Sequence, residues 1–288
     1  MTPNLRELLD DAASSKLPLI LPGAYDALSA RLAQAAKFPA VYVTGAGLAN
    51  AHFGIPDIGL VDLSQLCGHV TAIAEVVDLP LVVDADTGFG NAVAVTRTVR
   101  LLERAGAAAI QIEDQISPKR CGHFAGKDVI PVHEMLGKIR AALDSRKSEN
   151  TLIIARTDAV STEGLDRAID RGQLFSEAGA DAVFIEAPES RDALQAIGER
   201  VAGPLVANMV EGGLTPLLSR EDLGALGFQI VLYANSALRA AQMAVTEIYE
   251  VLAEFGTTAG ALNKMVSWNE RQAAVAKSSY DEVERKYS

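Results

Sequence analysis

Two stretches of the chain, "AGAAAIQIED" (105–114) and "AGADAVFIEA" (178–187), follow the same plan. In each, a glycine typical of a helix end precedes an apolar run that closes on an acidic residue. Eight apolar, β-rich runs alternate with segments of helix length along the chain: 18–23, 40–45, 80–86, 108–114, 151–158, 182–188, 204–209 and 230–235. Nearly continuous apolar strands separated by helices indicate a parallel sheet that is covered on both faces.

The number of units favours a closed barrel. Eight strand–helix units in 288 residues match an α/β fold of the (β/α)8 TIM-barrel type. The competing doubly wound sheet would need a glycine-rich dinucleotide fingerprint after its first strand, and "TGAGLAN" (44–50) supplies too little of one. We therefore expect one domain over residues 1–288, with the barrel at about 18–240 and C-terminal helices at about 241–288.

The last segment, 263–288, looks helical and carries Trp268 beyond the eighth strand. A single barrel has little surface left to cover at that point, so we expect this segment to pack on a neighbouring subunit. A helix folded back on its own barrel is the alternative.

Composition and charge narrow the function. The chain is 49% hydrophobic, which suits a large buried core, and its net charge is −11 with a pI near 4.9. Such a charge repels phosphate backbones and anionic lipid, so we expect no nucleic-acid or membrane partner. No apolar run reaches the roughly 20 residues of a membrane span, and the first residues lack the apolar core of a signal peptide. We expect a cytoplasmic protein that binds small anions through local cations.

The expected strands turn polar at their last residues. The polar residues are Thr44, Asp84, Asp86, Glu113, Asp114, Arg156, Asp158, Glu186, Asn208 and Asn235. In a barrel these strand ends converge on one rim, where the active site is built. The simpler explanation of these polar residues is that strands end where loops begin and loops are polar. That explanation does not account for so many carboxylates, which need a cationic partner when they are clustered.

A metal ion is the expected partner. Asp84 and Asp86 are two residues apart on one expected strand, project to the same side and lack an obvious protein cation. Oxygen donors are plentiful and the four histidines are dispersed, which favours Mg²⁺ or Mn²⁺ over Zn²⁺. Asp57, in "FGIPDIGLV" (53–61), either joins this site or caps a turn.

A basic stretch, "SPKRCGHF" (117–124), surrounds one of the two cysteines of the chain. Lys119, Arg120 and His123 flank Cys121, and neighbouring cations stabilise a thiolate. A solvated basic loop with an incidental thiol is the alternative interpretation. The glycine-rich segment 116–131 is bounded by proline and too polar to pack as a strand, so we expect it to act as a lid.

Four motifs in this order resemble the isocitrate lyase and phosphoenolpyruvate mutase superfamily: "FGIPDIGL" (53–60), "VDADTGFGN" (83–91), "IEDQISPKRCGH" (112–123) and "ARTDA" (155–159). "KRCGH" is typical of its carbon–carbon lyase branch, and the resemblance spans roughly residues 18–260. It implies a (β/α)8 barrel in a homotetramer that exchanges its last helices between neighbours. It also implies Mg²⁺ and a mobile loop over a 2-hydroxy or 2-oxo acid.

The resemblance also implies roles for individual residues. Asp84 would be the direct metal ligand, with metal-bound waters held by Asp57, Asp86 and Glu113. The substrate contacts would be Tyr42, Thr44, Gly45 and Ala46 as a carboxylate cradle, Arg156 as counter-ion, Glu186 and Asn208 on the rim, and Gly122 and His123 on the loop.

The implied reaction is cleavage of a 2-hydroxydicarboxylate, of the 2-alkylmalate or 2-methylisocitrate type, to a 2-oxo acid such as pyruvate and a second carboxylate. Arg156 would hold the 2-oxo acid and Cys121 would protonate the other fragment, near Lys119 and His123. The base is either Tyr42 or a metal-bound water.

Departures from the family pattern bear on the substrate, a small di- or tricarboxylate. "ANMVEGGLTPL" (207–217) resembles the branch that cleaves simple 2-alkylmalates, and "FAGK" (124–127) stands where methylisocitrate-specific members have Arg-Pro. "YAN" (233–235) is similar to the phosphonate mutases, but Ser236 replaces their histidine. The alternatives are phosphonopyruvate or carboxyphosphonoenolpyruvate mutase-type chemistry, oxaloacetate hydrolysis or decarboxylation, and a non-catalytic metabolite-binding protein.

Overall fold

The computed structural model describes residues 4–120 and 126–288, and in it eight parallel strands close into a barrel in sequence order. The strands are β1 (Leu19–Ala24), β2 (Val41–Val43), β3 (Leu81–Asp84), β4 (Ala107–Glu113), β5 (Leu152–Thr157), β6 (Ala182–Ile185), β7 (Leu205–Asn208) and β8 (Ile230–Tyr233). β8 pairs with β1, with Ile230 opposite Leu19. The predicted (β/α)8 barrel is confirmed, and all eight predicted runs contain a strand.

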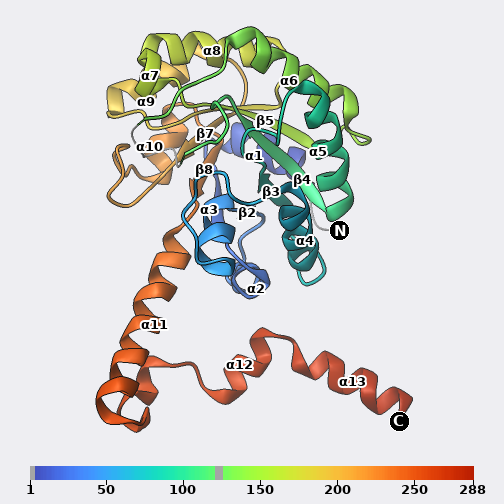
Figure 1. Cartoon of the computed structure of the whole chain (residues 1–288), viewed down its shortest axis with the longest axis vertical. Coiled ribbons are helices and arrows are strands. Elements are labelled where there is room, and N and C mark those ends of the chain that lie inside the picture. Colours follow the sequence, from blue (N-terminus) through green and yellow to red (C-terminus); the bar gives the residue numbers. More distant parts are fainter. Residues whose placement is uncertain (1–3, 121–125) are drawn as a thin grey trace.

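Helices surround the barrel (Figure 1). They are α2 (Ala27–Ala35), α3 (Gly45–Gly47), the π-helical turn η1 (Leu48–His52), α4 (Leu63–Ala74), α5 (Ala92–Ala105), α6 (Val132–Ser145), α7 (Val160–Glu163), α8 (Leu165–Glu177), α9 (Arg191–Arg200) and α10 (Arg220–Ala225). Polar side chains define where several of them begin, because Asp26, Asp62 and Ser190 accept hydrogen bonds from first-turn backbone N–H groups.

The two glycines of the repeated stretch end helices. Gly106 closes α5 in the left-handed conformation (φ 106°), and Gly179 has φ 96° before β6. A side chain at Gly106 would also collide with Ala74, since an added Cβ would lie 2.8 Å from the Ala74 Cβ. Glycine therefore permits both the turn and the close approach of α5 to α4.

The hydrophobic core has two layers, one inside the barrel and one between the barrel and its helices. Inside the barrel, Leu21, Val82 and Phe184 are among the buried side chains. Helix α1 (Leu5–Ser15) adds Leu5 and Leu9 to this inner layer. Side chains thus fill the interior of the barrel, and the polar residues collect at the carboxyl ends of the strands.

The C-terminal segment extends away from the barrel (Figure 1). It consists of α11 (Ser236–Phe255), the 3₁₀ helix η2 (Ala259–Lys264), α12 (Trp268–Ala274) and α13 (Lys277–Tyr287), so the predicted helical character is correct. Within α11, all of which the structure describes, no residue is buried, and Trp268 is 70% exposed. α12 comes near α2, but the segment is not buried against its own barrel. None of the helices described is both long and apolar enough to cross a bilayer.

Candidate active site

The polar strand ends surround a cavity of about 140 Å³ at the carboxyl end of the barrel. Its walls bring together the following predicted site residues: Tyr42, Thr44, Ala46, Asp57, Asp84, Lys119, Arg156, Glu186 and Asn208. Gly45 lines a smaller adjoining hollow with Asp84 and Asp86, and an added Cβ there would lie 3.3 Å from Asp84 Oδ2. The barrel thus gathers residues that are as far apart in the sequence as Tyr42 and Asn208.

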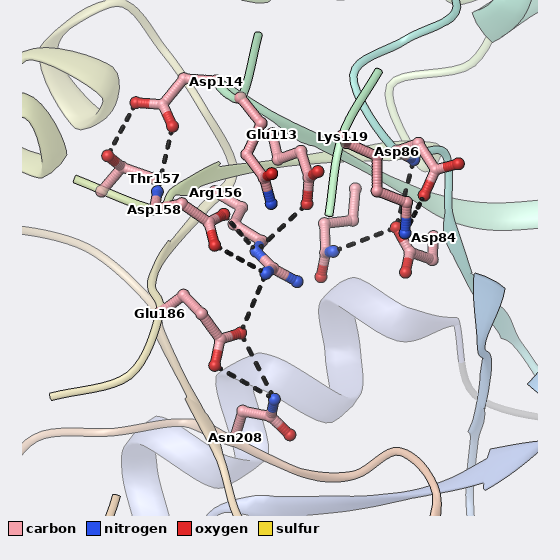
Figure 2. Close-up of polar contacts among 12 residues, drawn as sticks. Asp84, Asp86, Glu113, Asp114, Lys119, Arg156, Thr157, Asp158, Glu186 and Asn208 are labelled. Carbon is pink, nitrogen blue, oxygen red and sulfur yellow. Dashed lines mark hydrogen bonds and ion pairs between the residues drawn. The ribbon is translucent and has the colours of Figure 1, made fainter. Parts of the chain in front are cut away.

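Arg156 lies at the centre of the polar contacts (Figure 2). It is the second-to-last residue of β5, opposite Glu113 on β4, and its guanidinium contacts three carboxylates. Nε and Nη2 donate to Asp158 at 2.8 and 3.0 Å, whereas Glu113 and Glu186 lie 3.3 Å away. No described residue accepts a hydrogen bond from Nη1 of this arginine, which lines the cavity. The arrangement leaves one amino group of a buried cation for an anionic ligand.

Glu186 and Asn208 form the side of the cavity next to Arg156. Asn208 Nδ2 lies 3.3 Å from one Glu186 oxygen and 3.4 Å from the other. Thr44 and Asn235 are also linked, since the Thr44 hydroxyl lies 3.3 Å from Asn235 Oδ1. Thr44 in addition accepts from the backbone N–H of Gly47, which fixes the turn that follows β2.

Asp84 and Asp86 lie together, but not as the sequence predicted. β3 ends at Asp84, and Asp86 has left-handed backbone geometry (φ 48°), so the two do not share a strand face. The Asp86 backbone N–H donates instead to Asp84 Oδ1 at 3.2 Å. The prediction from strand alternation was wrong because the strand ends at Asp84, two residues before the end of the predicted run 80–86.

A protein cation does pair with these carboxylates, which corrects the expectation that they lack one. Lys119 Nζ lies 2.5 Å from Asp57 Oδ1. It also lies 2.8 Å from Asp86 Oδ1, a pair that Figure 2 shows. Burial alone would lower the pKa of Lys119, but Asp86, Glu113 and other nearby carboxylates raise it well above its usual value. Burial also raises the pKa of Asp86, to about 6, against the opposing effect of Lys119. Asp57 thus joins the cluster and does not merely cap a turn.

The remaining donors are of the type that binds a hard cation. Buried oxygens of Gln111 and Glu113, both Oε1, have no hydrogen-bond partner within residues 4–120 and 126–288. Across the same residues, no three His, Cys, Asp or Glu side chains are grouped closely enough to hold a metal among them. Mg²⁺ commonly keeps several waters and takes only one or two protein carboxylates. The space that Gly45 leaves open beside Asp84 suits such a site, so the donor set fits Mg²⁺.

Tyr42 is buried at the end of the barrel interior and is 3% exposed. Burial, together with the nearby Asp84 carboxylate, raises the pKa of Tyr42 well above its usual value. The side chain therefore stays a phenol that can donate a hydrogen bond to a ligand, which weighs against Tyr42 as the base.

Three predicted site residues, Cys121, Gly122 and His123, lie outside the described residues. The neighbouring chain is described on both sides. Arg120 and Gln115 hydrogen-bond each other, and Gln115 forms a β-bridge with Val129. The bridge joins the two ends of the predicted lid segment at its base.

Some cavity and contact residues were missed in the sequence. Gln111 lies 3.4 Å from Asp84 and shares a face of β4 with Glu113, a spacing of two that could have indicated it. Phe184 lies 5.0 Å from the Arg156 guanidinium on the next strand. Lys127 pairs with Asp158 at 2.9 Å, a contact made across 31 residues that no local pattern signals.

Comparisons with known proteins agree with this geometry. A family model described as phosphoenolpyruvate phosphomutase matches residues 8–253. The chain is 44% identical over 284 residues to the 2,3-dimethylmalate lyase of Eubacterium barkeri, covering 99% of this chain and 97% of that protein. It is 41% identical over 286 residues to the 2-methylisocitrate lyase of Aeropyrum pernix, covering 98% and 91%.

A solved structure is also similar over nearly its whole length. Oxaloacetate acetylhydrolase in complex with the inhibitor 3,3-difluorooxalacetate matches with a TM-score of 0.92 at 32% identity, covering 99% of this chain and 96% of that one. The similarities therefore include the barrel and the strand ends that line the cavity.

Proposed function

Since this chain belongs to the PEP mutase/isocitrate lyase superfamily, we propose that it is a Mg²⁺-dependent carbon–carbon lyase acting on a 2-alkylmalate-type 2-hydroxydicarboxylate. The products are a 2-oxo acid such as pyruvate and a second carboxylate. The observation that carries the proposal is the cavity itself, in which one amino group of the buried Arg156 remains available beside the Asp84 carboxylate.

The cavity favours a small substrate with an apolar substituent. Phe184, Val210, Leu232 and Ala234 form apolar parts of its wall, and its volume of about 140 Å³ is small for a ligand site. Apolar side chains stabilise a methyl group by burying it, but they cannot hydrogen-bond a third carboxylate. Together with the absence of Arg-Pro after His123, this favours a 2-alkylmalate over 2-methylisocitrate.

Asp84 would hold the metal directly, and Asp57, Asp86 and Glu113 would hold its waters. Bound Mg²⁺ supplies charge stabilisation for the oxygens of the 2-oxo acid as the C2–C3 bond breaks. Lys119 then stays paired with Asp57 and Asp86, and its positive charge offsets part of the negative charge of these carboxylates.

The residues of the chain supply the remaining functions. The Nη1 group of Arg156 binds the carboxylate of the 2-oxo acid half, and the Tyr42 phenol donates a hydrogen bond to the oxygen at C2. Glu186 and Asn208 hold Arg156 and the cavity wall in place. A base takes the proton of the C2 hydroxyl, and with Tyr42 kept as a phenol a water at the metal site would fill that role. The oxygen electrons then form the C2 carbonyl, the electrons of the C2–C3 bond pass to the departing carbon, and the Cys121 thiol protonates that carbon as a general acid.

A substrate panel tests the proposal. Purified protein with Mg²⁺ is incubated with 2,3-dimethylmalate, 2-methylisocitrate, oxaloacetate and phosphonopyruvate, and the products are identified by mass spectrometry. We expect a 2-alkylmalate to give the highest kcat/KM. The similarity to oxaloacetate acetylhydrolase makes oxaloacetate the second candidate. Ser236, which stands where the phosphonate mutases have a histidine, donates to Glu211 and provides no imidazole, so phosphonopyruvate should be a poor substrate.

Cys121 is tested on the best substrate of that panel. Cys121→Ala should lower kcat by roughly 10²–10⁴-fold, the range for loss of a positioned general acid. Cys67→Ala is the matched control, because Cys67 lies half-buried on α4, away from the residues that line the cavity, and should leave kcat unchanged. Near-normal turnover by Cys121→Ala would reject the thiol as the acid.

We also propose that the protein is a homotetramer in which the C-terminal helices pack on a neighbouring subunit. The large exposed apolar side chains of α11 to α13 support this arrangement.

A further inference from the structure

Asp158 lies at the centre of a buried chain of ion pairs that the proposed mechanism does not use. Its carboxylate accepts two hydrogen bonds from Arg156 on one side and one from Lys127, at 2.9 Å, on the other. The Lys127 and Asp158 side chains are 2% and 0% exposed. Burial alone would raise the pKa of Asp158, but Arg156 and Lys127 lower it, so the carboxylate is ionised.

The bidentate contact determines which edge of Arg156 faces the cavity. Asp158 takes the edge formed by Nε and Nη2, at 2.8 and 3.0 Å, and these are the shortest contacts of the guanidinium. The ring of Phe184 lies 5.0 Å from the guanidinium carbon. With this edge occupied, Nη1 is the group left for a ligand, as Figure 2 shows. A two-point contact of this kind fixes the plane of the arginine as well as its position.

Asp158 is itself held firmly. Its backbone N–H donates to Asp114 Oδ1 at 3.0 Å, and the neighbouring Thr157 hydroxyl donates to Asp114 Oδ2 at 2.7 Å. Asp114 in turn contacts Arg171, which forms a bidentate pair with Glu163. The carboxylate that orients Arg156 therefore rests on a second buried carboxylate.

Lys127 connects these ion pairs to the segment that follows the loop after Lys119. The segment after Lys127 lies on the strand end, since the Ile130 N–H donates to Asp114 O at 2.8 Å and Val129 bridges to Gln115. Lys119, before the loop, pairs with Asp57 and Asp86. The two lysines thus bind carboxylates on opposite sides of the site.

We propose that Asp158 is a positioning residue that presents Nη1 of Arg156 to the substrate carboxylate, and that Lys127 holds Asp158 in the orientation required. The proposal rests on the proposed function for the identity of the ligand, a 2-oxo acid carboxylate. Through Lys127, the order of residues 126–131 and the affinity of the arginine for that carboxylate are coupled.

The proposal is testable because a purely electrostatic role of Asp158 and an orienting role predict opposite changes in anion binding when Asp158 is neutralised. A carboxylate beside Arg156 repels an anionic ligand, so neutralising Asp158 should tighten anion binding if the residue acts only through its charge. If Asp158 orients the guanidinium, the same change should weaken binding, because Arg156 loses its bidentate partner.

The experiment measures the Kd of oxalate, a planar analogue of a 2-oxo acid, by calorimetry on the full chain with Mg²⁺. Asp158→Asn should raise the Kd roughly 10-fold or more, the scale of losing a hydrogen bond to a charged group. Asp181→Asn is the matched control: it also removes a carboxylate paired with arginines, Arg6 and Arg146, but Asp181 precedes β6 at the end of the barrel away from the cavity, so the Kd should change less than about 2-fold. Circular dichroism melts confirm that each variant is folded.

Lys127→Met provides a second variant if Asp158→Asn fails to fold. It should raise the Kd for oxalate roughly 3–10-fold, and the Lys127→Met/Asp158→Asn double variant should be no weaker than Asp158→Asn, because both act on Arg156 through one contact. An equal or lower Kd in Asp158→Asn, additive effects of the two changes, or no oxalate binding by the wild-type protein would overturn the proposal. If the variants change the Kd for oxalate as predicted but the wild-type protein cleaves no 2-hydroxy acid, the proposed function is rejected and the role of Asp158 is not.

Discussion

Three carboxylates gather around the Lys119 ammonium. Asp57 and Asp86 pair with it, and Asp84 lies near enough to raise its pKa, while Arg156 serves another group of acids. Burial strengthens the repulsion among such groups and raises the pKa of Glu113 well above its usual value, even with Arg156 next to it. A divalent cation at Asp84 would relieve this excess of negative charge.

Metal affinity should therefore depend on Asp84. Asp84→Asn should weaken Mn²⁺ binding by at least roughly 10–100-fold, because it removes a full charge from the proposed direct ligand. Electron paramagnetic resonance of free Mn²⁺ measures the Kd without any substrate. Asp62→Asn is the control, because Asp62 lies on the surface and asparagine can still accept the hydrogen bond that caps the start of α4. This variant should leave the Kd for Mn²⁺ unchanged. Equal Kd values in the two variants would contradict the assignment.

Asp114 makes stability depend on pH. Burial raises the pKa of Asp114 to about 6, above the roughly 3.9 of an unfolded chain. The folded state therefore binds the proton more tightly, and this contribution is present below about pH 4 and is lost as the pH rises through about 6. Asp114→Asn lacks the titration, so its free energy of unfolding relative to wild type should rise by roughly 2–3 kcal/mol between pH 4 and 7.

Urea unfolding at several pH values measures this difference. A difference between wild type and Asp114→Asn that stays constant from pH 4 to 7, or that falls, would show that Asp114 is not held near pKa 6.

Individual site residues differ in how far the sequence could reveal them. Asp84, Arg156 and Glu186 lie within one residue of the ends of their strands, so the period of the apolar runs and the barrel geometry are enough to bring them to one rim. The partners of Lys119 and Lys127 depend on where the segments that end at Arg120 and begin at Gly126 lie on that rim. No local spacing encodes such contacts, which join residues 62 and 31 positions apart.

At the scale of the elements, backbone contacts make particular glycines necessary. Gly198, within α9, lies where an added Cβ would be 1.8 Å from the carbonyl oxygen of Leu226, just after α10. A backbone group cannot move aside as a flexible side chain can. The packing of α9 on the end of α10 therefore requires the smallest residue.

Gly198→Ala should destabilise the protein by about 1–3 kcal/mol, the cost of overpacking, although alanine is the better helix former. Gly68→Ala is the matched control within α4, where nothing lies within 4 Å of the added Cβ, and it should stabilise by roughly 0.5–1 kcal/mol. Thermal unfolding gives both values. Two variants that shift the Tm in the same direction would contradict the packing described.

The strands and most helices could be predicted because the apolar runs and capping residues are local signals. The boundary of β3 could not, since its apolar run continues through Ala85 while the backbone turns at Asp86. The π-helical turn η1 likewise has no period that distinguishes it from the end of a loop.

The whole molecule exposes an unusual amount of apolar surface at its C-terminal end. Met243, Tyr249, Phe255 and Trp268 are each at least 63% exposed, and all lie on helices that extend from the barrel (Figure 1). The sequence predicted helices here, but no local pattern predicts where they lie relative to the barrel.

Light scattering tests the proposed tetramer. At micromolar concentration the mass should be about four times the 30.4 kDa of one chain. Phe255→Glu should lower the mass by placing a charge in the proposed interface. Val93→Glu, at a 75% exposed position on α5, is the control and should leave the mass unchanged. A monomer mass for the wild-type protein would reject exchange of the C-terminal helices.

The reaction in deuterated water tests the central claim most directly. Protein, Mg²⁺ and 2,3-dimethylmalate are followed by proton nuclear magnetic resonance in D₂O. Cleavage of the C2–C3 bond, with protonation of the released carbon by an acid that exchanges with solvent, predicts pyruvate and propionate in equal amounts, with one deuteron at C2 of propionate. Consumption of oxaloacetate or phosphonopyruvate without cleavage of any 2-alkylmalate would contradict the account.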